Sequence, residues 1–390
     1  MRLIQKYISL RILILFFITL GISCHKSKVE DGVIFDTSFL SARLDSVKRI
    51  SENRYSVFID PSFEPVNKSP WFAFVVTSES EKEIEIELNY GNYKHRYIPK
   101  LSSDKKEWKK IDPSQVKIDT ALGRAILKLN VSPQKLYVAA QEIESSKDTY
   151  VWLDSTIKKH PFLQKNVAAK TVKGSNNYVV NSNLKANKAI VLIARQHPPE
   201  IPGGTIGFKA FYEELLNDTK TANAFRRMYN IIAFPLLNPD GVDMGNWRHN
   251  ANGVDLNRDW IAFTQPETNM VKEYLSTKIK KDVKINFAID FHTSYSGPYM
   301  LVLDSINERK TKGVIPDWIK NIEANSQFKV ETRRRSQDLP YCYNYFYNQF
   351  GSEAVTYEDG DEIDRNIIKD RAKVYAQELI KTMLLSNNTK

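Results

Sequence analysis

Four nearly continuous apolar runs in the second half of the chain constrain its fold more than any other feature. They lie at residues 189–194, 231–237, 285–291 and 354–357. A strand with one face in water alternates apolar and polar residues, whereas a strand covered on both faces is apolar almost throughout. Stretches with helical spacing separate the runs, as in the segment from Phe208 to Leu215. The second half is therefore predicted to be an α/β domain with a mixed or parallel sheet, over residues 146–388.

The first half of the chain has a different pattern. Ile84, Ile86, Leu88 and Tyr90 alternate with polar residues, which predicts a strand with one buried face. Short β-branched and aromatic runs at 71–76, 126–131 and 136–138 predict further strands, separated by turn residues. Short strands at this spacing predict a small antiparallel β-sandwich over residues 34–145, in front of the α/β domain.

The first 24 residues are predicted to be an export signal. Three cations precede an apolar run over residues 12–20, which is too short to span a bilayer as a helix. The sequence Gly21-Ile22-Ser23-Cys24 resembles a bacterial lipobox, in which the cysteine is acylated. We therefore expect a membrane-anchored lipoprotein of the bacterial cell envelope, facing the periplasm or the exterior, with residues 25–33 as a tether. A plain signal peptide with an incidental cysteine is the alternative.

Charge and cysteine content argue against a nucleic-acid partner and against an intramolecular disulfide. The net charge of +10 is scattered along the chain without a block of lysine and arginine, so no nucleic-acid partner is predicted. Once Cys24 is acylated, Cys342 is the remaining cysteine and has no partner for an intramolecular disulfide.

Metal-ligand chemistry is concentrated after two of the apolar runs. His197 and Glu200 follow the run that ends at residue 194, and His292 ends the run from residue 285. Side chains at the carboxyl ends of parallel strands meet at one edge of the sheet. Two imidazoles and one carboxylate leave an open coordination position on Zn²⁺, which a catalytic zinc requires. The His197–Glu200 pair and His292 each carry little weight alone, but together they predict a zinc site.

A polar loop after the second apolar run contains two arginines, Arg248 and Arg258, together with several amides and a glycine. Arginine suits bidentate capture of a carboxylate. Without the predicted zinc site, a solvated loop would be the simpler interpretation.

Several motifs in this order along the chain are typical of the zinc carboxypeptidases. They are His-Pro-Pro-Glu at 197–200, Asn-Pro-Asp-Gly at 238–241, Gly-Val-Asp-Leu-Asn-Arg at 253–258 and Thr-Tyr-Glu at 356–358. The chain resembles the cytosolic carboxypeptidase subfamily in particular, which includes the deglutamylases of eukaryotic tubulin. Ala-Arg-Gln-His-Pro at 194–198 and Ser-Pro-Trp-Phe at 69–72 carry this likeness, which spans residues 33–385.

The resemblance implies a role for each candidate residue. His197, Glu200 and His292 would hold one zinc ion per chain, with Asp255 orienting the imidazole of His197. The remaining roles fall to residues that act on the substrate. Asn257 and Arg258 would bind the terminal carboxylate of a peptide, Arg248 would stabilise the oxyanion, and Glu358 would be the general base.

Some positions stay open. The family's substrate-closing tyrosine has no unambiguous counterpart, because Tyr341 and Tyr343 also suit packing. Acidic residues at 359, 361 and 362 compete with Glu358, although Glu358 ends a buried strand. The three arginines at 333–335 would favour acidic C-terminal residues if they line the pocket, and would otherwise form an exposed turn. A cell-wall peptide amidase or D,L-carboxypeptidase, and an inactive peptide-binding lipoprotein, are the alternative functions.

Overall fold

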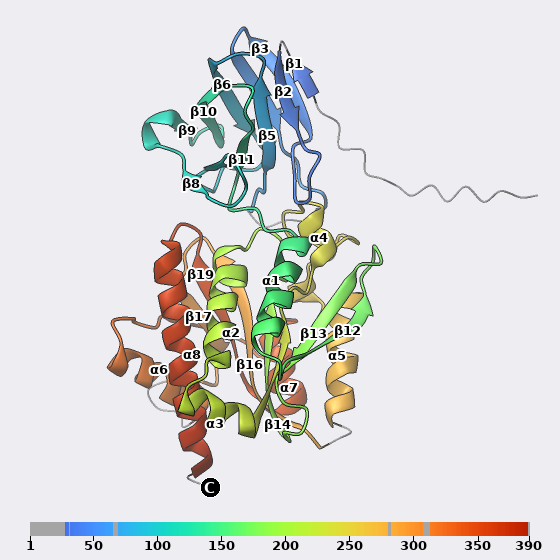
Figure 1. Cartoon of the computed structure of the whole chain (residues 1–390), viewed down its shortest axis with the longest axis vertical. Coiled ribbons are helices and arrows are strands. Elements are labelled where there is room, and N and C mark those ends of the chain that lie inside the picture. Colours follow the sequence, from blue (N-terminus) through green and yellow to red (C-terminus); the bar gives the residue numbers. More distant parts are fainter. Residues whose placement is uncertain (1–27, 31, 65–68, 280–281, 307–312, 389–390) are drawn as a thin grey trace, which may run out of the picture.

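A computed structural model of the chain describes residues 28–30, 32–64, 69–279, 282–306 and 313–388. The expected export signal, with Cys24, lies outside the described residues. Figure 1 shows two bodies stacked along the long axis, an N-terminal β body and a larger α/β body. Within the described ranges, we find no helix that is both long and apolar enough to cross a lipid bilayer.

The β body consists of two sheets, with strand orders β1-β2-β5-β11-β7-β8 and β3-β4-β6-β10-β9. Neighbouring strands are antiparallel except β4 and β6, which run parallel. The strands are β1 (Lys28–Glu30), β2 (Val33–Asp36), β3 (Ser46–Ser51), β4 (Arg54–Phe58), β5 (Ala73–Ser78), β6 (Lys82–Asn89), β7 (Lys100–Ser102), β8 (Lys109–Lys110), β9 (Val116–Asp119), β10 (Arg124–Val131) and β11 (Leu136–Ala139).

The two sheets pack face to face around one core. The predicted alternating strand is β6, whose Ile84, Ile86 and Leu88 are buried. Phe35 of the first sheet packs against Tyr55 of the second, with ring centroids 5.5 Å apart. β1 falls inside the segment that the sequence indicated as a tether, and it pairs with β2 as an edge strand.

The α/β body is built on an eight-stranded mixed sheet with the order β12-β13-β15-β14-β16-β19-β17-β18. The four apolar runs of the sequence form the four adjacent strands β15, β14, β16 and β19, which are mutually parallel. Strands covered on both faces by protein need apolar side chains on both faces, as these runs have. The strands are β12 (Gln164–Lys170), β13 (Asn176–Asn181), β14 (Lys188–Ala194), β15 (Tyr229–Phe234), β16 (Lys284–Ser294), β17 (Tyr299–Leu303), β18 (Thr332–Arg335) and β19 (Glu353–Gly360).

Helices cover this sheet, and α1, α2 and α8 lie in front of it in Figure 1. Helix α8 contacts α2, α3 and α6, while α7 packs against β16 and β19. The helices are α1 (Ser146–Lys159), α2 (Phe208–Leu216), α3 (Lys220–Met228), α4 (Pro239–Asp243), α5 (Pro266–Ile279), α6 (Val314–Asn325), α7 (Cys342–Phe350) and α8 (Arg365–Asn388).

The loop after α4 joins the two bodies. Trp247 belongs by sequence to the α/β body but is buried in the core of the β body, where its ring lies edge-on to Tyr93 at 5.2 Å. The Ser62 hydroxyl donates a hydrogen bond to Asn246 Oδ1 at 2.7 Å. A Cβ on Gly253 would lie 2.7 Å from the Phe63 ring, so glycine permits this close approach. The β body therefore holds the segment that carries the predicted substrate-binding residues.

Candidate active site

The predicted ligands meet at the carboxyl edge of the central strands. His197 follows β14, and His292 lies near the end of β16. On the neighbouring parallel strand β19, Glu358 is directly opposite His292 in register. Residues paired in register project from the same face of a sheet, so Glu358 lies beside the metal ligands although it is far from them in sequence.

The turn that bears His197 and Glu200 is fixed by unusual local structure. Arg195 has a φ of +57°, uncommon for a residue with a side chain, and its Nε donates to the carbonyl of Pro198 at 2.8 Å. A Cβ at Gly203 would lie 1.8 Å from the carbonyl oxygen of His292. Glycine is therefore required for the turn after Glu200 to pass over the end of β16.

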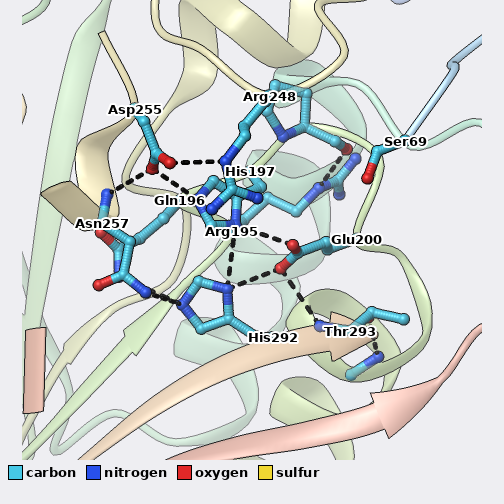
Figure 2. A network of polar contacts seen from close by, with 12 residues as sticks. Ser69, Arg195, Gln196, His197, Glu200, Arg248, Asp255, Asn257, His292 and Thr293 are labelled. Carbon is cyan, nitrogen blue, oxygen red and sulfur yellow. Dashed lines mark hydrogen bonds and ion pairs between the residues drawn. The ribbon is translucent and has the colours of Figure 1, made fainter. Parts of the chain in front are cut away.

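The ligand atoms of three residues converge on one point (Figure 2). His197 Nδ1 lies 2.8 Å from Glu200 Oε1, His292 Nδ1 lies 2.7 Å from Glu200 Oε2, and the two Nδ1 atoms are 3.1 Å apart. Within the described ranges, these three residues are the group of histidine, cysteine and acidic side chains able to hold a metal ion together.

Each ligand imidazole directs its other nitrogen at a carboxylate. His197 Nε2 contacts Asp255 Oδ1 at 2.9 Å, and His292 Nε2 contacts Asp290 Oδ2 at 2.8 Å. A carboxylate behind a ligating histidine fixes its tautomer and the orientation of the ring. Both histidines are therefore oriented with Nδ1 toward the common point.

The charges of this group suit a cation. Burial alone would raise the pKa of Glu200, but the imidazoles of His197 and His292 hold that pKa well below its usual range. Burial opposes ionisation of Asp255 as well, yet His197 and Arg248 keep its pKa low. Both carboxylates are therefore anionic near neutral pH.

The donor set fits Zn²⁺. Ligand atoms at about 2.0–2.2 Å from a tetrahedral zinc lie roughly 3.3–3.5 Å from one another. The three pairs measured here are 2.7–3.1 Å apart, so a small outward movement would admit the ion. Two nitrogens and one oxygen, with a carboxylate behind each imidazole, are a typical environment of a catalytic zinc.

A cleft of about 340 Å³ opens above these ligands. Its walls include the four predicted substrate-facing residues Arg248, Asn257, Arg258 and Glu358, together with Tyr341. The Arg258 guanidinium lies 4.5 Å over the ring of Tyr341. The neighbouring Tyr343 is buried and does not belong to the cleft wall.

Glu358 differs from its acidic neighbours in what it faces. Its Oε2 is buried, without a hydrogen-bond partner among the described groups, and burial raises the pKa of Glu358 to about 8. Asp359 points to the other side of β19 and pairs with Arg371 at 2.6 Å. Asp361 and Glu362 pair with cations of the β body. Of the four candidates, Glu358 is the one that faces the cleft.

The substrate-facing loop is bound to the ligand set through Asp255. Arg248 Nε donates to Asp255 Oδ2 at 2.5 Å, while the other oxygen of Asp255 contacts His197. Asn257 Oδ1 accepts a hydrogen bond from the backbone N–H of Cys342 at 2.9 Å. The loop is thereby fixed beside the cleft from two directions.

The three arginines of β18 make different contacts. Arg333 lies 3.6 Å over the ring of Tyr299 and pairs with Glu331, and Arg334 donates to a backbone carbonyl. Arg335 alone of the three belongs to the cleft wall. The expectation of a basic pocket therefore depends on one arginine rather than three.

Sequence reasoning missed several residues of this site. Asp290 lies two positions before His292, so it shares a face of β16 with that ligand, and this spacing could have revealed it. Gln196 donates to Asp290 at 2.7 Å and accepts from Trp260 at 2.9 Å. Ser69 and Arg96 of the β body also line the cleft. Ser69 begins the Ser-Pro-Trp-Phe motif, which carried the family likeness without a role in the site, and no local pattern signals Arg96.

Two imidazoles and one carboxylate at the base of an open cleft, with a further carboxylate and arginines in its walls, define a metal-dependent hydrolase site. The sequence profile of the zinc carboxypeptidases matches residues 149–387, and the chain belongs to this family. The predicted fold, a carboxypeptidase-like α/β body behind a β body, is confirmed.

Known proteins similar to this chain agree with that assignment. Cytosolic carboxypeptidase 6 of Caenorhabditis elegans is 25% identical over 351 residues, covering 83% of this chain and 74% of that protein. Cytosolic carboxypeptidase 3 of Mus musculus is 23% identical, and the match covers 73% of this chain but 32% of that protein. The chain thus spans about a third of that longer relative.

Two solved structures share the fold over both bodies. A metallo-carboxypeptidase from Burkholderia cenocepacia has a TM-score of 0.74 and 18% identity, covering 92% of this chain and 99% of that one. A metallo-carboxypeptidase from Pseudomonas aeruginosa, in complex with (2-guanidinoethylmercapto)succinic acid, has a TM-score of 0.73 and 19% identity, covering 91% and 99%.

Proposed function

We propose that this protein is a zinc-dependent carboxypeptidase that hydrolyses the last peptide bond of peptides with a free C-terminal carboxylate. The observation that carries the proposal is the convergence of His197, Glu200 and His292 within 4.8 Å of one another, in a cleft shared with Glu358. These three residues would hold one zinc ion per chain. When bound, zinc polarises the scissile carbonyl and lowers the pKa of water to roughly 7.

Asn257 and Arg258 would bind the terminal carboxylate of the substrate. A guanidinium and an amide offer several N–H donors to the two carboxylate oxygens, and an internal residue of a peptide has no such carboxylate. This requirement limits cleavage to the end of a chain. Arg248, held by Asp255, would donate to the oxygen on which negative charge develops during attack.

Glu358 would act as the general base. Glu358 lines the cleft, its Oε2 has no hydrogen-bond partner among the described groups, and it would accept a proton from the attacking water and return it to the departing amine. Its raised pKa arises from burial, with the negative charges of Glu200 and Asp290 adding to it. A nearby divalent cation would lower that pKa, so Glu358 would be ionised and basic near neutral pH.

A preference for acidic C-terminal residues is supported by Arg335 in the cleft wall. A cation near the side-chain pocket favours a carboxylate on the released residue. We expect Arg335→Met to reduce the release of C-terminal glutamate relative to alanine by roughly tenfold, which is the size of one charge-assisted hydrogen bond.

The function is tested by supplying the purified protein with zinc and offering peptides with varied C-terminal residues alongside cell-wall muropeptides. We expect release of single amino acids from the peptides. This release should stop with a chelator and return with zinc. Glu358→Gln should retain zinc and lose about 10²- to 10⁴-fold in kcat.

Other outcomes would replace the proposal. Cleavage of muropeptides alone would indicate a cell-wall amidase or D,L-carboxypeptidase. Tight peptide binding without turnover would indicate an inactive peptide-binding protein. The site of Glu358 beside the three proposed metal ligands favours an active enzyme over the inactive binding protein.

For location, we propose that Cys24 is acylated and holds the protein on a membrane of the bacterial cell envelope, facing the periplasm or the exterior. The apolar run and the lipobox-like sequence before Cys24 support this. Cys24→Ala should abolish incorporation of labelled fatty acid and release the protein from the membrane fraction. Unchanged fractionation would contradict it.

A further inference from the structure

In the described part of the β body, Ser69 and Arg96 line the active-site cleft. Ser69 precedes β5, Arg96 lies between β6 and β7, and both face the cavity that holds the metal ligands. Arg96 Nη1 donates to Ser69 Oγ at 2.6 Å, so the two side chains form one polar unit. The α/β body alone therefore does not complete the cleft.

The guanidinium of Arg96 is fixed in place. Its Nε and Nη2 donate to the two oxygens of Asp361 at 2.7 and 3.0 Å, in a bidentate pair that is mostly shielded from water. Asp361 comes three residues after Glu358, directly beyond the end of β19. A guanidinium held in this way loses little conformational freedom when it donates to a ligand.

Ser69 lies across the metal ligands from the carboxylate-binding side. In Figure 2, Asn257 is at one side of His197 and Glu200, and Ser69 is at the other. A substrate whose terminal carboxylate is at Asn257 must pass its scissile bond over the metal ligands. The preceding residues, each about 3.3–3.6 Å long when extended, then run toward Ser69 and Arg96.

We propose that Ser69 and Arg96 form a subsite for the part of the peptide upstream of the scissile bond. They would donate hydrogen bonds to a main-chain carbonyl oxygen, and longer peptides would therefore be better substrates than dipeptides. The inference rests on the proposed carboxypeptidase function. It makes the β body a contributor to substrate recognition.

A simpler role for Arg96 would be to fasten the two bodies together. Lys100 provides the comparison, because its Nζ lies 3.0 Å from Glu362 across the same interface while Lys100 does not belong to the cleft wall. Lys100→Met therefore breaks a contact of the same kind without touching the proposed subsite.

The test measures kcat/KM for N-acetylated alanyl peptides of two, three and four residues. Each ends in the residue that the wild type releases fastest. We expect the wild type to gain roughly ten- to hundredfold when the added residue reaches the subsite, as for a hydrogen bond to a charged group. Ser69→Ala and Arg96→Met should lose most of this gain, so each should lose far more kcat/KM on the tetrapeptide than on the dipeptide. Lys100→Met should keep the gain.

Ser69→Ala leaves the Arg96–Asp361 pair intact, so it remains informative if Arg96→Met fails to fold. Retention of the length-dependent gain in Ser69→Ala and Arg96→Met would overturn the subsite while the carboxypeptidase function stands. An equal loss on dipeptide and tetrapeptide would also overturn it, because that pattern indicates a purely structural role. If the wild type hydrolyses none of the peptides, the proposed function itself fails.

Discussion

The two halves of the active site are built in different ways. The ligand half, consisting of His197, Glu200 and His292, is positioned by strand ends of the central sheet, entirely within the α/β body. The clamp half, residues 246–258, is a loop that the β body holds through Trp247, Ser62 and Phe63. The proposed metal site thus depends on one body, whereas the loop that carries the proposed substrate-binding residues depends on both.

Asp255 connects the halves, since one of its oxygens faces His197 and the other faces Arg248, and Asn257 Nδ2 also lies 3.4 Å from His292 Nε2. If the halves are otherwise independent, changes in one should leave the measurable property of the other intact. Zinc affinity reports on the ligand half, and KM and kcat for peptides report on the clamp half.

The largest separate effect is expected for Arg248→Met. Removing one preorganised donor to a developing oxyanion costs about 10²- to 10³-fold in kcat. Zinc affinity should stay within about threefold of the wild type, because the three ligands are untouched. Steady-state kinetics and chelator competition measure the two quantities. A large loss of zinc affinity would mean that Asp255 couples the two halves, so that they cannot be perturbed separately.

Asp290→Asn should act on the ligand half alone. Loss of the carboxylate behind a ligating histidine typically weakens metal binding by about 10- to 100-fold. Chelator competition should show this loss, and saturating zinc should restore kcat. Asp255→Asn is the comparison, and it should weaken zinc binding to a similar degree. It should also lower kcat at saturating zinc, because Arg248 loses its partner. Identical behaviour of the two variants would contradict the division.

Acidification should lower the stability of the β body, which holds the clamp half, because His95 is largely buried there. Burial lowers the pKa of His95 to about 4, and its Nε2 is buried without a partner in the described part of the chain. The unfolded chain, with a histidine pKa of about 6.5, binds the proton more readily, so stability is full above that pH and falls as the pH drops toward 4. At pH 5 the loss is about 2 kcal/mol.

Denaturant unfolding at pH 7.5 and pH 5 measures this loss. His95→Gln removes the titrating group, and its stability should fall by about 2 kcal/mol less than that of the wild type between the two pH values. Equal losses in both proteins would show that His95 is not responsible.

The smallest effect is expected for Trp247→Phe, which leaves every cleft residue in place but loosens the loop before Arg248. We expect KM for peptides to rise about tenfold with unchanged zinc affinity, because a small displacement of a positioning group is costly. Trp318→Phe is a matched control, since Trp318 is equally buried but lies on α6 and packs against α8, away from the loop. Both should lose about 1–3 kcal/mol of stability. An equal rise in KM for both variants would contradict the coupling.

The ligand half was accessible from the sequence. Its strands are nearly continuous apolar runs, and His197, Glu200 and His292 lie at or just beyond the ends of those runs, so local pattern and sheet geometry bring them together. The register of β16 and β19 then favours Glu358 over its acidic neighbours.

The support for the clamp half was not accessible from the sequence. The burial of Trp247 in the β body and the pairing of Arg96 with Asp361 join residues more than 150 positions apart. Neither contact leaves a periodic or local signal, because each depends on how two distinct cores pack against each other. The sequence therefore predicted the substrate-facing residues themselves better than the contacts that hold them.

The central claim, a zinc ion held by the ligand half, is tested most directly by X-ray diffraction at the zinc absorption edge from crystals of the zinc-loaded protein. We predict one anomalous peak per chain, about 2.0–2.2 Å from His197 Nδ1, His292 Nδ1 and a carboxylate oxygen of Glu200. A peak elsewhere, or one that leaves any of these three side chains uncoordinated, would contradict the account.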